Sequence, residues 1–286
     1  MDAPHIYAFA DEASPMMDGQ IAAMARNGLQ GVEVRTVDGE NVSSITVEKA
    51  REVKKKLDGA GLIAWSIGSP IGKIDIEKDD FPAHLDALRR TAEIARVLGT
   101  ENIRMFSFYL PRDKEPSLFR SQVMDRLHEM AEIAKEAGVR LCHENEKGIY
   151  GDNAARCRDI LDQVPLLAGV FDPANFVQCG QDTWEAWEQL KDRIFYLHIK
   201  DALFADGSVT PAGKGEGNVA RIVGDYLARG GRDMTVEPHL KVFRGLDALE
   251  RAGEKTRMGD FAYANSDEAF DAACAALKEI LKDVSA

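Results

Sequence analysis

The sequence predicts a single (β/α)8 TIM barrel, and three observations lead to that fold class. The chain has 286 residues, of which 45% are hydrophobic, and about 250 residues is the usual size of such a barrel. Short apolar runs alternate with longer amphipathic segments eight times, as repeated βα units around a parallel sheet do. No Pro/Ser-rich linker or shift of composition marks a second domain, so we expect residues 1–286 to form one domain.

The eight apolar runs are the predicted strands. They cover residues 5–9, 31–34, 62–67, 102–106, 139–144, 167–172, 194–199 and 234–237. A doubly wound open sheet is the alternative fold, but it needs a glycine-rich phosphate turn after the first strand. The residues that follow the first run are Ala-Asp-Glu-Ala, which favours the barrel.

Amphipathic segments between these runs predict the helices. Apolar residues spaced by three and four over 85–98 indicate one helix, with Gly99 as its C-cap. The connections after the strands are longer and more polar, notably over 68–80, 201–217 and 238–265. In a barrel these loops surround the active mouth, and we expect the long strand-8 loop over 238–265 to form a lid or a subunit contact.

Composition excludes several kinds of partner. The formal net charge of -12, from 36 basic and 48 acidic residues, repels a polyanion, so we expect no nucleic acid. Four cysteines without a CxxC pair indicate reduced thiols. The N-terminus lacks the pattern of a signal peptide and no run reaches ~18 apolar residues, so we expect a cytoplasmic protein without a membrane partner.

Four consecutive predicted strands end on a side chain that can bind a metal: Glu144, Asp172, His198 and Glu237. Side chains at these strand ends point into one shared cavity. Burying three carboxylates without a cation costs several kcal/mol each, so the pattern predicts a divalent metal, although any one of the four alone is better explained as a helix cap or ion-pair partner. The donor set suits Mn2+ or Mg2+ best, with Co2+ and Zn2+ as alternatives.

Five motifs carry a resemblance to a known family. They are HENEKGIYGD at 143–152, GVFDPANF at 169–176, YLHIKDA at 196–202, GKGEGN at 213–218 and VEPH at 236–239. With these motifs the chain resembles the xylose-isomerase-like barrel superfamily, which includes sugar-phosphate isomerases and epimerases, ketose 3-epimerases, hydroxypyruvate isomerase and inosose dehydratase. The resemblance implies the same four metal ligands, proton transfer by Glu144 and Glu237, and a homodimer or homotetramer.

The sequence departs from the ketose 3-epimerase pattern at two places. Asn175 stands where those enzymes carry a histidine, and Ile199-Lys200-Asp201 stands where they carry a glutamate and an arginine. A strict ketose 3-epimerase is therefore not what the motifs predict.

The function predicted is a metal-dependent isomerase or epimerase of a small sugar, keto-sugar or sugar phosphate. The proton next to a metal-bound carbonyl would move through an enediolate, with Glu144 and Glu237 as catalytic groups. Predicted substrate contacts are Lys200, Asn175, His239, Glu33 and, in a glycine-rich run that could bind phosphate or simply form a rim loop, Lys214.

Three alternatives remain beside this function. A metal-dependent dehydratase or lyase of an inosose or keto-polyol would use the same site. An apurinic endonuclease fits less well, because its metal cluster needs many histidines and this acidic chain has six. A non-catalytic sugar-binding barrel would be expected to lose at least one of the four ligands.

Overall fold

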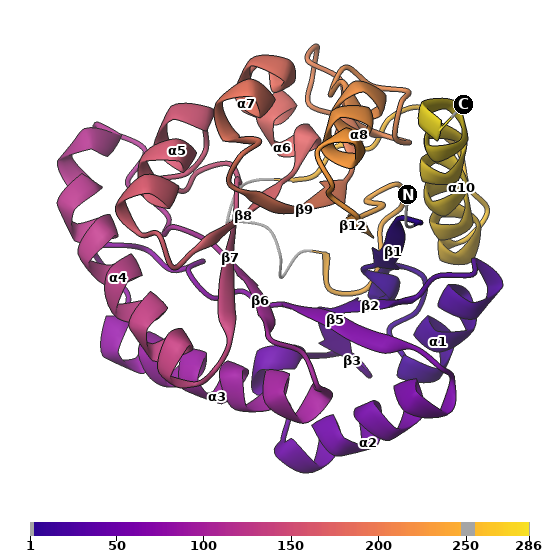
Figure 1. Cartoon of the computed structure of the whole chain (residues 1–286), viewed down its shortest axis with the longest axis horizontal. Helices are drawn as coiled ribbons and strands as arrows, with labels where there is room; N and C mark the ends of the chain where they lie inside the picture. Colours follow the sequence, from indigo (N-terminus) through magenta and orange to yellow (C-terminus); the bar gives the residue numbers. More distant parts are fainter. Residues whose placement is uncertain (1–2, 247–254, 286) are drawn as a thin grey trace.

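Eight parallel strands close into a barrel, as the sequence predicts (Figure 1). The computed structural model describes residues 3–246 and 255–285. The strands, in their order round the barrel, are β1 His5–Ala8, β2 Gly31–Val34, β5 Ile63–Gly68, β6 Asn102–Met105, β7 Arg140–Glu144, β8 Ala168–Phe171, β9 Ile194–Ile199 and β12 Asp233–Val236. The barrel closes because β1 pairs in parallel with both β2 and β12.

Helices surround the strands (Figure 1). They are α1 Met17–Arg26, α2 Val47–Gly59, α3 Phe81–Leu98, α4 Arg120–Glu136, α5 Ala154–Gln163, α6 Pro173–Gln178, α7 Thr183–Leu190, α8 Val219–Ala228 and α10 Ser266–Ser285. Two short antiparallel pairs lie in the loops, β3 Thr36–Val37 with β4 Glu40–Asn41 and β10 Asp201–Ala202 with β11 Val209–Thr210. Gly99 ends α3 in the left-handed conformation, with φ +81°, which confirms the predicted C-cap.

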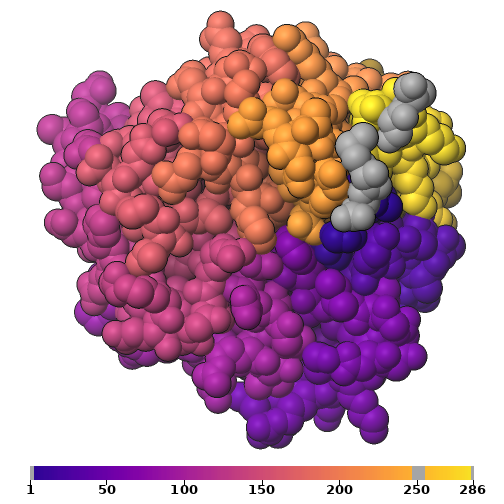
Figure 2. Space-filling model, viewed as in Figure 1, coloured from indigo at the N-terminus to yellow at the C-terminus, as the bar shows by residue number. Residues whose placement is uncertain are grey.

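The two ends of the chain lie side by side. In Figures 1 and 2 the yellow C-terminal helix α10 stands against the indigo N-terminal part of the chain. Arg26 of α1 donates to the carboxylates of Asp267 and Asp271 on α10 at 2.7 and 2.9 Å. Exposed ion pairs of this kind contribute little, so the packing of buried residues such as Phe270 and Leu277 is what holds α10 in the ring.

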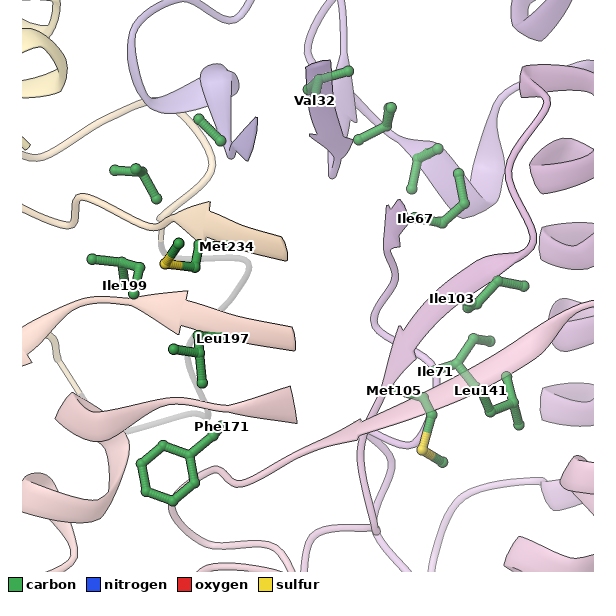
Figure 3. Packing of buried hydrophobic residues seen from close by; sticks show 14 of the residues in the cluster. Val32, Ile67, Ile71, Ile103, Met105, Leu141, Phe171, Leu197, Ile199 and Met234 are labelled. Carbon is green, nitrogen blue, oxygen red and sulfur yellow. The ribbon is translucent and has the colours of Figure 1, made fainter. Parts of the chain in front are cut away.

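Outward-facing strand residues form the main hydrophobic core. Successive side chains of a strand point to opposite sides, so Leu141, Phe171 and Leu197 of β7, β8 and β9 join the cluster that the helices cover (Figure 3). Apolar residues of the surrounding helices supply most of the rest of that cluster, and the short helix α6 contributes Phe176 to it. At about 1.5–3 kcal/mol for each fully buried large side chain, this layer is the main stabilising term of the barrel.

The inward-facing residues change character along the barrel. Cys142, Val170 and Tyr196 form a small apolar cluster inside it. The next inward residue on each of these strands, two positions later, is Glu144, Asp172 or His198. The barrel interior is therefore apolar at Cys142, Val170 and Tyr196 and charged two residues later along each chain segment, at the carboxyl ends of the strands.

The strand ends differ slightly from the prediction. Asp172 and Glu237 each follow the last residue of their strand, β8 and β12, because the chain turns there to begin a loop or helix. Residues 247–254 of the predicted strand-8 loop over 238–265 lie outside the described residues, whereas Leu246 and Thr256 on either side line the pocket at the mouth. In the described part of the chain no helix is long and apolar enough to cross a bilayer.

The loop between β5 and α3 packs closely on β6. Gly72 has φ +88°, and a Cβ there would lie 2.0 Å from the carbonyl oxygen of Phe106, so glycine is required. The Gly72 N–H donates to Nε2 of His84 at 2.8 Å. His84 must be neutral at Nε2 to accept this bond, and burial lowers its pKa to about 4.

His84 is expected to make the stability of the protein depend on pH. The unfolded chain binds this proton near pH 6.5 and the folded chain near pH 4, so the contribution is complete above pH 6.5 and is lost as the pH falls toward 4. We expect a loss of roughly 1–3 kcal/mol across that window. Denaturant unfolding at several pH values should show it in the native chain and not in His84→Gln, whose amide oxygen accepts the same bond without titrating. Equal pH profiles for both proteins would contradict this account.

Candidate metal and substrate site

The four predicted ligands meet at the mouth of the barrel. Each of Glu144, Asp172, His198 and Glu237 offers one ligand atom, and these atoms all lie within 4.8 Å of one another. All four side chains are buried. They come from β7, β8, β9 and β12, which are neighbours in the sheet (Figure 1), so the convergence expected from the sequence is present.

His198 is held between two carboxylates. Its Nδ1 lies 2.8 Å from Oε1 of Glu144, and its Nε2 lies 3.1 Å from Oε2 of Glu33. Burial disfavours the charged imidazolium, but the two carboxylates outweigh it and raise the pKa of His198 to about 10. Glu33 fixes one ring nitrogen, so the other faces the carboxylates of the proposed ligand set, and a carboxylate behind the ring is usual for a metal-binding histidine.

Glu33 lies behind His198 rather than in the pocket. It is fully buried and accepts hydrogen bonds from Tyr196 Oη at 2.9 Å and Thr235 Oγ1 at 2.8 Å. Glu33, a predicted substrate contact, is not among the residues that line the pocket; in this structure it supports His198 instead.

Asp172 is fixed by the turn into α6. It caps this helix, because its Oδ1 accepts from the N–H of Asn175 at 3.0 Å. The side chain of Asn145 pairs with both the N–H and the C=O of Asp172, each at 2.9 Å. The other oxygen, Oδ2, makes no hydrogen bond of ordinary geometry, although Lys200 Nζ lies 2.9 Å away.

Lys200 supplies a positive charge among the carboxylates. Its Nζ lies 2.9 Å from Asp172 Oδ2 and 3.0 Å from Glu237 Oε2. Burial opposes the charged ammonium, but the carboxylates raise the pKa of Lys200 above its usual value. The inward phase predicted for Lys200 is therefore confirmed, and its partners include Asp172 as well as Glu237.

A buried arginine holds Glu237 from the other side. Arg35 donates to Glu237 Oε1 at 3.2 Å, to Asp11 at 2.9 Å and to Glu12 at 3.1 Å. Asp11 and Glu12 therefore bind Arg35. Burial raises the pKa of Glu12 to about 8 even though Arg35 opposes this shift.

The donor set fits a divalent cation. Three carboxylates and an imidazole converge without thiolates, and such hard donors suit Mg2+, Mn2+ or a similar ion. Burial raises the pKa of Asp172 to about 7, so the site carries an electrostatic cost that a bound cation would relieve. Glu12, Glu237 and His239 form a second close group, but there Arg35 already bonds to Glu12 and Glu237.

A pocket lies at these ligands, and Glu144 and Glu237 form part of its lining. Its lining includes the predicted contacts Lys200, Asn175 and His239. His239 adopts a left-handed backbone conformation, φ +45°, which costs about 1–3 kcal/mol in a residue other than glycine. Its N–H donates to Glu12 Oε2 at 2.6 Å, so the same acidic pair that holds Arg35 also fixes His239.

Lys214 is exposed and does not belong to the residues that line this pocket. The glycine-rich run around it wraps Asp201, whose carboxylate accepts from the N–H groups of Gly213, Gly215 and Gly217 at 2.8–3.0 Å. These N–H groups are thereby occupied. The structure favours the rim-loop interpretation of this run over the phosphate site.

Sequence reasoning missed several pocket residues. They are Arg35, Lys73, Arg104, Glu146, Lys147 and Gln178. Arg104 had a usable signal, because it shares the inward phase of the apolar strand β6 with Phe106, and a charge at such a position needs a functional or ion-pair explanation. Phe106 lines the pocket, whereas Phe108 belongs to the core and Trp65 packs on the inner cluster with Tyr196.

Removing the charge of Glu33 is expected to weaken metal binding. Glu33→Gln keeps a group that can bond to Tyr196 but loses the carboxylate that orients His198, and changes behind a metal ligand typically cost 10- to 100-fold in affinity. Calorimetric titration with Mn2+ would measure it. Tyr196→Phe, which removes one hydrogen bond from Glu33 and leaves its charge, is the matched control with a smaller effect. Unchanged affinity in Glu33→Gln would contradict the supporting role.

The sequence of this chain is similar to those of known proteins. The family model described as xylose isomerase-like TIM barrel matches residues 21–238. An inosose dehydratase of Mesomycoplasma hyopneumoniae (strain 7448) is 24% identical over 191 residues, which cover 64% of this chain; the chain spans 62% of that protein's length.

Two solved structures show the same fold. A xylose isomerase-like TIM barrel protein from Mycobacterium smegmatis in complex with magnesium is 13% identical, with a TM-score of 0.69 and all of both chains covered. The 3-keto-D-glucoside 4-epimerase from E. coli, in its apo form, is 15% identical, with a TM-score of 0.66 over 93% of this chain and 94% of that one. At these identities the likeness shows the fold, and the family model, which covers about three quarters of the sequence, shows that the chain belongs to the xylose isomerase-like TIM barrels.

Proposed function

We propose that this protein is a metal-dependent isomerase or epimerase that moves a proton next to the carbonyl of a small sugar or keto-sugar. The observation that carries the proposal is the convergence of Glu144, Asp172, His198 and Glu237 beside a pocket that Glu144 and Glu237 line. A divalent ion held by these residues would polarise the substrate carbonyl and stabilise the charge that proton removal leaves. Proteins similar to this chain include a 3-keto-D-glucoside 4-epimerase and an inosose dehydratase.

Glu144 is the proposed base. It lines the pocket, and its Oε1 and Oε2 are oriented by His198 and Arg104, at 2.8 and 3.3 Å. A carboxylate fixed in this way is placed to take a proton from a carbon atom bound against it. Glu237 lines the pocket from β12 and is the proposed partner that returns the proton on another side of the substrate.

The environment of Glu237 limits that second role. Burial raises the pKa of Glu237, but Lys200, His239, His198 and Arg35 outweigh it, and the pKa lies well below the usual value. A carboxylate with so low a pKa is a weak base. Lys200, whose ammonium lies 3.0 Å from Glu237, is therefore the member of the pair that carries a proton to give.

A dehydratase of an inosose or a related keto-polyol is the second candidate, and Lys200 is the observation that favours it. β-Elimination needs one base beside the carbonyl and one acid that protonates the departing hydroxyl. Glu144 and Lys200 supply both within the pocket. The relative named inosose dehydratase is consistent with this outcome.

Exchange of carbon-bound hydrogen tests the step that both candidates share. The protein supplied with Mn2+ or Mg2+ is incubated in D2O with ketoses, aldoses and an inosose, and NMR follows deuterium at the carbon next to the carbonyl. We expect exchange in the native chain and a fall of 10²- to 10⁴-fold in Glu144→Gln, with metal content measured on both proteins. Glu93→Gln, an exposed change on α3, is the control.

The product separates the two candidates. A new epimer or isomer with no change in composition supports the isomerase, and a new ultraviolet absorbance from a conjugated enone supports the dehydratase. Absence of exchange with every substrate class, in a protein shown to contain metal, would contradict both.

A further inference from the structure

We propose that one wall of the pocket, formed by Lys73, Arg104 and Lys147, binds an oxyanion of the substrate, so that the substrate is a sugar acid or a sugar phosphate rather than a neutral sugar. We call this set of residues the cationic wall. The inference rests on the proposed function and names its substrate class.

The cationic wall is assembled from three neighbouring segments. Lys73 lies in the loop after β5, Arg104 lies in β6, and Lys147 follows β7; all three line the pocket. The ring of Phe106 joins two of them, because Lys73 Nζ and Arg104 Cζ lie 4.4 and 4.6 Å from its centroid. The positive groups are therefore held against a common apolar surface.

Arg104 is the most deeply buried member, and one of its guanidinium nitrogens makes no hydrogen bond within the described residues. Its side chain is 5% exposed, and Nε lies 3.3 Å from Glu144 Oε2, yet this buried Nε makes no hydrogen bond of ordinary geometry in the described part of the chain. Glu144 also belongs to the proposed metal set. When a cation shares that carboxylate, the guanidinium is left with less negative charge than it needs.

The outer part of the wall contains two lysines, Lys73 and Lys147, and the carboxylate of Glu146. Glu146 lies 3.1 Å from Lys73 Nζ. Lys147 Nζ itself donates to a neutral group, Oε1 of Gln178, at 3.2 Å.

Charge and position together indicate the ligand. A carboxylate or phosphate between Arg104 and Lys147 would receive charge-assisted hydrogen bonds, which are about twice as strong as neutral ones. Arg104 adjoins Glu144, so the carbonyl end of the same molecule can reach the metal ligands. The glycine-rich loop offers no competing oxyanion site, because Asp201 accepts the N–H groups of Gly213, Gly215 and Gly217.

Three matched probes test this inference. D-Fructose, D-fructuronate and D-fructose 6-phosphate share the hydroxyketone end and differ at the sixth carbon, which carries a hydroxyl, a carboxylate or a phosphate. Their affinities are measured by calorimetry on the metal-loaded protein. We expect at least one anionic probe to bind about tenfold or more tightly than D-fructose, and the stronger of the two identifies the oxyanion.

Two variants with opposite expected effects locate the binding group. Lys147→Met should remove most of the anionic preference, and Glu146→Gln, which removes the competing carboxylate, should increase it severalfold. Lys55→Met, an exposed change on α2, is the control for loss of a surface charge. Misfolding would lower the affinity for all probes alike, so only a change in the ratio of anionic to neutral affinity supports the wall.

The outcomes separate this inference from the proposed function. Equal affinities of the three probes, or an anionic preference that neither variant changes, overturn the cationic wall even if proton exchange occurs. An anionic preference that follows the variants without any proton exchange supports the wall and counts against the proposed chemistry.

Discussion

Buried negative charge at the barrel mouth is the constraint on which the rest of the site depends. Glu144, Asp172 and Glu237 converge as buried side chains, and each ionised carboxylate there costs several kcal/mol unless a cation lies beside it. Arg35, Arg104 and Lys200 supply part of that charge, each within 3.3 Å of one of these carboxylates. A divalent ion would supply the remainder at the centre.

The stability of the fold compensates for the free-energy cost of this buried charge. Outward-facing residues of the strands and the helix faces form a continuous core, so the interior of the mouth need not contribute hydrophobic stability. Neighbouring side chains hold the proposed ligands in place. Glu33 orients His198, and Asn145 fixes Asp172. Asp11 and Glu12 hold Arg35 against Glu237. Preorganised ligands of this kind are what a catalytic metal site requires.

Much of this arrangement could be predicted from the sequence. Alternation of apolar runs and amphipathic segments predicts the barrel, and the strand-end positions of Glu144, Asp172, His198 and Glu237 predict their convergence, because strands of a parallel barrel share one mouth. Lys200 follows from the same alternation. These inferences depend on local periodicity, which the sequence displays directly.

Other features depend on contacts between distant segments. Glu33 bonds to His198, Tyr196 and Thr235, which lie 165, 163 and 202 positions away, so its supporting place depends on how β2, β9 and β12 are brought together. Arg35 pairs with residues 24 and 202 positions away, and Lys73 meets Glu146 across 73 positions. Lys214 was predicted as a substrate contact from the glycine-rich composition of its loop. In the structure the backbone N–H groups of that loop point to the side chain of Asp201.

Metal content is the most direct test of the central claim. Elemental analysis of the purified protein, with and without added Mn2+, is compared with Glu144→Gln, Glu237→Gln and, as a control that faces the pocket without belonging to the ligand set, Glu146→Gln. This account predicts one equivalent of a divalent metal that falls in the first two variants and persists in the control. A native protein that binds no metal even after Mn2+ is supplied would contradict it, and so would a metal retained in full by both ligand variants.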